Sequence, residues 1–203
     1  MADVKQWDVF PTKIFESQFK TTEEIKKYIL QQEGDMINHA PTYTKQGADN
    51  ELQKSKIFKP LVEHIHSLTE NICKIYEYKY DAIEITNMWI NVTVPGACHP
   101  PHTHSNNLFS GVWYPIKMED DVSDIQFFDP RPQGNQLTPV RNKMTSTNTS
   151  AMAFPANENF LLQFPAWLMH WVPATLVKRT SVSWNVILRG EYGEENTLQN
   201  ANI

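Results

Sequence analysis

The spacing of apolar residues changes near Tyr80, and this change limits the folds open to the chain. From Ile83 onward apolar residues recur at every second position, the period of strands with one buried face. This pattern predicts strands over six ranges: 83–94, 108–116, 124–128, 151–154, 159–164 and 178–189. Many short strands in succession favour a β-sandwich or jelly roll.

Before Tyr80 the apolar spacing is helical. Thr21 and Glu24 form a capping box that predicts a short first helix. A second helix is expected to begin near Pro60, because apolar residues then repeat every three or four positions. The polar residues 33–55 between these helices are expected to form a loop.

The length of 203 residues suits one domain. We expect a single domain over residues 1–203, mainly β with flanking helices, around a β-sandwich or jelly-roll core. Within it, residues 1–80 give helical support, 81–190 form the core, and 191–203 form a polar tail.

Composition limits the partners and the compartment. Hydrophobic residues make up 40% and the formal charge is −5, so nothing resembles the basic surface of a nucleic-acid binder. No signal peptide is visible, and no stretch has the ~18 consecutive apolar residues of a membrane span. The two cysteines, Cys73 and Cys98, are expected to be free thiols in a reducing, cytoplasmic setting. A homodimer is left open.

Three histidines fall within residues 99–107, which read HPPHTHSNN. In an extended segment His102 and His104 point to the same face, as two ligands of one metal ion must. Imidazole is a common transition-metal ligand, so this pair predicts a metal site. His99 would need a turn to join it. The alternative is a solvated loop that is rich in histidine.

A third ligand is expected at His170, which stands in the apolar segment FPAWLMHWVP. Taken alone, His170 is better explained as a histidine packed in the core. The strand that follows changes this balance. One strand face is shared by Arg179, Ser181, Ser183 and Asn185, and a buried guanidinium requires an anionic partner such as a carboxylate ligand. The alternative is that this face meets solvent.

Five motifs together carry a family resemblance. They are HTH at 102–104, SGVWY at 110–114, DPR at 129–131, FPAWLMHWVP at 164–173 and RTSVSWN at 179–185. In their order and spacing the chain resembles the 2-oxoglutarate- and Fe(II)-dependent dioxygenases. Within this class it resembles the small oxygenases found in marine bacteria and their phages, and the resemblance covers nearly the whole chain.

This resemblance implies a double-stranded β-helix (jelly-roll) core with Fe(II) at its mouth, and with His102, His104 and His170 as ligands. Arg179, Ser183 and Tyr114 would bind 2-oxoglutarate. Five further residues are expected to line the pocket or to support the ligands: His99, Asn91, Ser110, Trp113 and Asn185. The implied reaction uses O2 to decarboxylate 2-oxoglutarate to succinate and CO2 while a second, unidentified substrate is hydroxylated.

One residue departs from the broad superfamily, which carries an acid where this chain has His104. Three neutral ligands leave the metal site more positive. Asp129 is an alternative source of a carboxylate, but it has its own place in the DPR motif, so we assign His104 as the ligand.

Two other classes of protein compete with this interpretation. A metal-binding cupin barrel shares the glycine followed by HxH, but Leu108 and Phe109 stand where its glutamate is expected. A non-catalytic jelly-roll module with zinc on three histidines is the second alternative. Neither explains an inward-facing Arg179.

Overall fold

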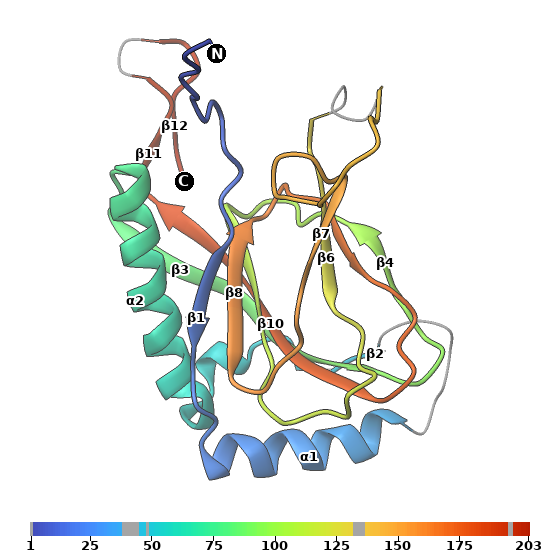
Figure 1. The fold of residues 1–203 in the computed structure, drawn as a ribbon. Helices are drawn as coiled ribbons and strands as arrows, with labels where there is room; N and C mark the ends of the chain where they lie inside the picture. The colour runs from blue at the N-terminus through green and yellow to red at the C-terminus, as the bar shows by residue number, and fades with distance from the viewer. Residues whose placement is uncertain (1, 38–44, 48, 132–136, 195–196) are drawn as a thin grey trace.

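The computed structural model describes residues 2–37, 45–47, 49–131, 137–194 and 197–203. Two antiparallel sheets face each other and make up the body of the molecule (Figure 1). The larger sheet has the order β1-β8-β5-β10-β3-β2, with β1 Phe15–Gln18, β8 Phe160–Pro165, β5 Phe109–Trp113, β10 Arg179–Arg189, β3 Ala82–Thr93 and β2 Lys45–Gln46. The smaller sheet has the order β4-β9-β6-β7, with β4 His99–His102, β9 His170–Val172, β6 Ile125–Phe128 and β7 Ala151–Phe154.

The predicted strands are confirmed to within a few residues at each end. Four strands of the larger sheet and four of the smaller one form the double-stranded β-helix that was expected. The sequence pattern missed the short β4 and β9. The tail also contains a small two-stranded sheet, in which β11 Glu191–Tyr192 pairs with β12 Ala201–Asn202.

Two helices cover the outer face of the larger sheet (Figure 1). They are α1 Glu23–Ile37 and α2 Lys59–Tyr76, and short 3-10 helices at Leu52–Lys54 and Lys56–Phe58 precede α2. None of the helices that the structure describes is long and apolar enough to cross a membrane.

Two expectations about the first helix were wrong. The cap is one residue later than predicted, because the Thr22 hydroxyl accepts the hydrogen bond from the Ile25 backbone N–H at 3.2 Å. Thr21 instead donates to the Pro115 carbonyl. The loop predicted over 33–55 was placed too early in the sequence at its first end, because α1 continues to Ile37. Residues 38–44 and 48 of that predicted loop lie outside the described residues.

The packing of the core under the helices requires a glycine at one position of β5. Trp184 and Trp113 are fully buried among isoleucines from α1 and α2. Gly111 stands opposite Trp184 on the neighbouring strand β5. A Cβ atom at this glycine would lie 2.1 Å from Cζ2 of Trp184, so only glycine lets the indole pack across the strand.

A second apolar cluster fills part of the space between the two sheets. It joins Val112, Leu162 and Phe164 of the larger sheet to Ile125 and Phe127 of the smaller one. Along β10 the side chains that face this space are polar, while the alternate ones pack against the helices. This polar face is where the candidate site lies.

Candidate metal and 2-oxoglutarate site

Three histidines meet where the smaller sheet ends. β4 and β9 pair antiparallel and place His102 directly opposite His170. His104 follows β4, and its backbone N–H donates to the Ala166 carbonyl at 2.9 Å. One ligand atom from each histidine lies within 4.8 Å of the other two, so the described residues contain a cluster suited to one metal ion.

Backbone carbonyls orient two of these rings. Nδ1 of His102 lies 2.8 Å from the Pro100 carbonyl oxygen, and Nδ1 of His170 lies 2.9 Å from that of Leu168. A carbonyl only accepts, so each Nδ1 carries the hydrogen and each Nε2 keeps a free lone pair. Metal-binding histidines are held by this arrangement in many proteins.

Burial keeps the cluster neutral. Together with the repulsion of the neighbouring imidazoles, it lowers the pKa of His104 to about 4 and that of His170 to about 3. The pKa of His102 is also lowered by burial. Near neutral pH all three rings are therefore unprotonated, and a metal ion need not displace protons to bind.

No carboxylate joins the cluster in the described part of the chain. Asp129, the alternative that the sequence left open, forms a two-pronged ion pair with Arg131, with hydrogen bonds of 2.9 and 2.8 Å. This pairing lowers the pKa of the Asp129 carboxyl. The residues present therefore fit a divalent ion held by three neutral nitrogens.

Arg179 is buried on the polar face of β10, with only 3% of its surface exposed. Its guanidinium donates to the Tyr114 hydroxyl at 2.8 Å, to the Ser123 carbonyl at 3.2 Å and to the Ser181 hydroxyl at 3.4 Å. It forms no ion pair with any described residue. A buried cation without an anion is costly, so this pocket is suited to an anionic ligand.

Tyr114 adds a donor to this pocket. It is fully buried, and burial raises the pKa of its phenol, so the hydroxyl keeps its proton. Because its oxygen accepts from Arg179, the hydrogen remains free for a ligand. Ser183 is in the same situation, since its oxygen accepts from the Asn91 amide at 2.9 Å.

A chain of amides and hydroxyls supports the histidine cluster from the larger sheet. The Ser110 hydroxyl donates to the side-chain oxygen Oδ1 of Asn185 at 2.6 Å, and the side-chain N–H of Asn185 donates to Oδ1 of Asn87 at 2.8 Å. The Asn185 side chain also hydrogen-bonds to His104. Asn87 and Ser181 were not among the predicted site residues, although both follow the period-two pattern of their strands.

Of the residues predicted to support the metal site, one lies beside the histidine cluster and another lies outside the site. The His99 ring stacks on the His102 ring, with centroids 4.3 Å apart and planes at 12°. Trp113 lies outside the site, and this expectation was wrong. Its indole N–H donates to the Phe19 carbonyl at 3.0 Å on the helix side of the sheet, because side chains alternate along β5.

Comparison with known proteins supports this geometry. A family model described as "Putative 2OG-Fe(II) oxygenase" matches residues 87–185. That stretch contains the three histidines, Tyr114, Ser183 and Arg179. No curated protein matches the sequence.

Solved structures share the fold at low sequence identity. A Pseudomonas putida prolyl-4-hydroxylase has a TM-score of 0.58 at 14% identity, covering 86% of this chain and 93% of its own. A Trichoplax adhaerens prolyl hydroxylase, solved with a hypoxia inducible factor peptide fragment, has a TM-score of 0.58 at 12% identity, covering 86% and 83%.

The epimerase SnoN from nogalamycin biosynthesis is also similar. Its complex with Fe3+, α-ketoglutarate and nogalamycin RO has a TM-score of 0.59 at 11% identity, covering 92% of this chain and 83% of its own. The structural likenesses show the double-stranded β-helix, and the family match points to the chemistry. Residues 87–185 match the model of the putative 2-oxoglutarate/Fe(II) oxygenases, and the histidine cluster in this stretch could hold the iron ion that such enzymes use.

Proposed function

We propose that this protein is a 2-oxoglutarate- and Fe(II)-dependent hydroxylase, which couples the oxidative decarboxylation of 2-oxoglutarate to hydroxylation of an organic substrate. The products from the co-substrate would be succinate and CO2. One observation carries this proposal: a buried arginine without an anion shares the inter-sheet space with three neutral histidines. His99 links the two groups, since it interacts electrostatically with both Arg179 and His104.

His102, His104 and His170 would hold the iron through their free nitrogens. Iron bound here supplies the activation of O2 and of the co-substrate that the reaction requires. The chain keeps the three rings oriented through the carbonyls of Pro100 and Leu168 and through Asn185. Three protein ligands leave positions on the ion open for exchangeable ligands.

Arg179 would bind the distal carboxylate of 2-oxoglutarate. A guanidinium matches a carboxylate geometrically and offers the charge that burial makes valuable. The free hydroxyl hydrogens of Tyr114 and Ser183 would complete the carboxylate's hydrogen bonds, while Asn91 orients Ser183. His99, beside His102, would position the opposite end of the co-substrate.

The direct test is spectroscopic. Fe(II) and 2-oxoglutarate are added without oxygen, and the weak visible charge-transfer band of the chelate is measured; oxygen is then admitted and succinate is assayed. We expect the band and succinate formation in the native chain, and neither at the same 2-oxoglutarate concentration in Arg179→Ala. Arg189→Ala is the matched control, because Arg189 pairs with Glu84 at the surface.

The outcome can contradict the proposal in two ways. If the native protein shows no band and no affinity for 2-oxoglutarate, it does not use this co-substrate. If Arg179→Ala binds 2-oxoglutarate as tightly as the native chain, the anion site lies elsewhere.

A further inference from the structure

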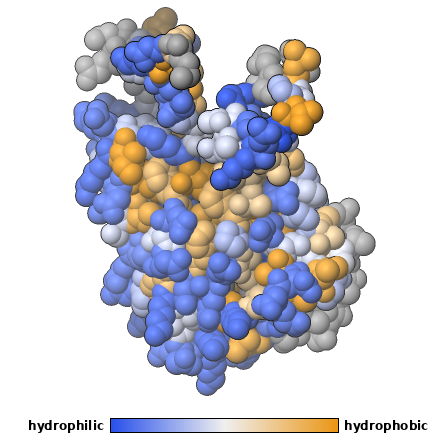
Figure 2. All heavy atoms as spheres, viewed as in Figure 1, coloured by the Kyte–Doolittle hydropathy of each residue, from blue (hydrophilic) through white to orange (hydrophobic). Residues whose placement is uncertain are grey.

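A groove of about 500 Å³ opens at the edge of the larger sheet where α2 ends and β5 begins, and none of the residues assigned above lines it. In Figure 2 the surface is hollowed between two protrusions, with apolar residues below the hollow. The groove is lined by the chain from Phe10 to Lys13, the end of α2, the start of β5, and the residues that follow β6 and β8.

The wall of this groove is joined to the metal-binding segment. Pro165 and Trp167 line the groove, and Ala166 between them accepts the hydrogen bond from the His104 backbone N–H at 2.9 Å. Ala166 also donates to Leu108, another lining residue, at 3.0 Å. A molecule held in the groove therefore lies against the backbone that positions His104.

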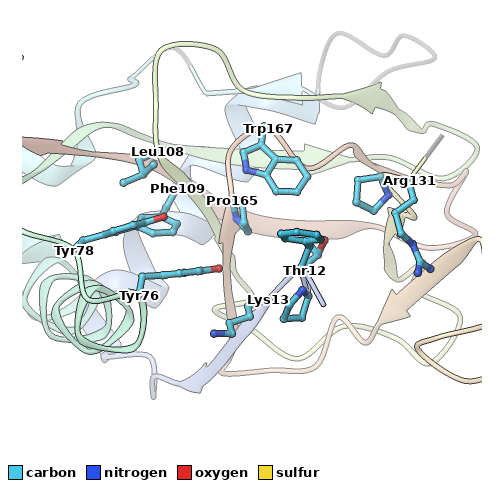
Figure 3. A pocket seen from close by; sticks show the side chains of 12 residues that line it. Thr12, Lys13, Tyr76, Tyr78, Leu108, Phe109, Arg131, Pro165 and Trp167 are labelled. Atoms are coloured by element: carbon cyan, nitrogen blue, oxygen red, sulfur yellow. The ribbon is translucent and has the colours of Figure 1, made fainter. Parts of the chain in front are cut away.

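Aromatic rings dominate the lining. Tyr76 stacks on Tyr78, with centroids 5.0 Å apart and planes at 10°, and Phe109 continues the stack at 6.3 Å from Tyr76. Figure 3 shows these rings toward one end of the groove, with Trp167 and Lys13 on opposite sides. Trp167 is 57% exposed, so a large flat apolar surface remains uncovered. Such a surface is suited to a planar apolar ligand.

The charge of the groove has the opposite sign to that of the whole chain. The formal charge of the protein is −5, yet the groove lining contains Lys13 and Arg131 and no acidic residue. Asp129 neutralises Arg131. Lys13 has no ion pair with a described carboxylate, and its Nζ lies 5.0 Å from the centre of the Tyr76 ring. One cation is therefore available to a ligand.

We infer that the groove binds the substrate to be hydroxylated, and that this substrate is a small aromatic acid. Its ring would pack among Tyr76, Tyr78 and Trp167, and its acid group would meet Lys13. A volume of about 500 Å³ lies in the range of sites for small molecules. The inference that the bound molecule is a substrate rests on the proposed function. The preference of the groove for small aromatic acids is independent of that function.

Binding is tested on the metal-free full chain with two probes of the same shape, 2-naphthoate and its neutral amide, 2-naphthamide. Affinities are measured by titration calorimetry, and the site by the shift of the Trp167 indole N–H resonance. We expect the acid to bind about fivefold more tightly than the amide. Lys13→Met should remove this preference and leave amide binding unchanged, whereas Trp167→Ala should weaken both probes about tenfold.

The matched control is Lys59→Met, because Lys59 lies at the other end of α2 and pairs with Glu63. Equal affinity for acid and amide, or no effect of Lys13→Met, would overturn the inference. So would displacement of the probe by extended peptides and not by small aromatic acids. Since iron is absent from this experiment, its failure is distinct from the absence of the 2-oxoglutarate chelate band.

Discussion

The two faces of β10 have different tasks although their residues alternate along one strand. Val182, Trp184 and Val186 point to the helices and are fully buried in the apolar core. Arg179 and Ser183 point between the sheets and take part in a polar network. Stability and ligand binding are therefore encoded in neighbouring residues, and substitutions one position apart should separate the two properties.

The largest effect is expected on the apolar face. Trp184→Ala removes a fully buried indole and should lower the free energy of unfolding by about 3–5 kcal/mol, because the cavity cannot collapse completely. Urea denaturation of the metal-free protein measures this loss. Ser183→Ala, one position earlier, should cost less than about 1 kcal/mol. Similar losses in the two variants would contradict the separation of the faces.

The next effect is expected on the polar face. Arg179→Met should weaken 2-oxoglutarate binding by about 2–5 kcal/mol, since the carboxylate loses a buried charged partner. Without 2-oxoglutarate the same variant should be at least as stable as the native chain, because an unpaired buried cation is removed. Calorimetric titration and thermal unfolding test the two halves. A variant that is less stable and binds normally would reverse the roles assigned to this face.

The histidine cluster should make the stability of the metal-free protein depend on pH. Its rings are neutral when folded, with a pKa of about 4 at His104 and about 3 at His170, but titrate near 6.5 when unfolded. The unfolded chain thus binds more protons in acid, so the free energy of unfolding should fall as pH decreases from about 6.5 toward 4. Urea denaturation across this range, in the presence of a chelator, measures the slope.

The comparison for this slope is His170→Gln, which cannot take up a proton at this position. Its stability should fall less steeply over the same pH range. Identical slopes in the two proteins would mean that His170 is not held neutral by burial.

The smallest effect is expected one residue further from the ligand. Asn91→Ala leaves Ser183 in place but removes the amide that donates to it at 2.9 Å. We expect 2-oxoglutarate to bind about threefold to tenfold more weakly, as for the loss of one hydrogen bond. The same titration measures it, with Asn71→Ala on the exposed side of α2 as the control. A loss as large as that of Arg179→Met would place Asn91 in direct contact with the ligand.

Periodicity predicted the features of the fold that depend on the direction of side chains along a strand. The period of two separated Arg179 and Ser183 from Trp184, and the structure confirms that separation. The same rule could have excluded Trp113, because Tyr114 and Trp113 cannot face one space. The short β4 was not predicted because its two prolines argue against a strand.

Features built from distant parts of the chain were beyond the sequence. The cross-strand pairing of His102 with His170 joins residues on separate strands, and no local pattern predicted that these two residues lie opposite each other. The groove brings Lys13 beside Tyr76 and Trp167, and no local pattern links these three positions. The Ser123 carbonyl that binds Arg179 has no side-chain signal at all.

The carbonyls of Pro100 and Leu168 have a consequence for how the enzyme acquires its metal. They belong to the backbone, so they keep the His102 and His170 rings in place whether or not an ion is present. A metal ion would then bind to a preformed site, and its binding would not be a step of folding. The protein should therefore tolerate repeated stripping and refilling, and the choice of ion would follow supply and coordination chemistry.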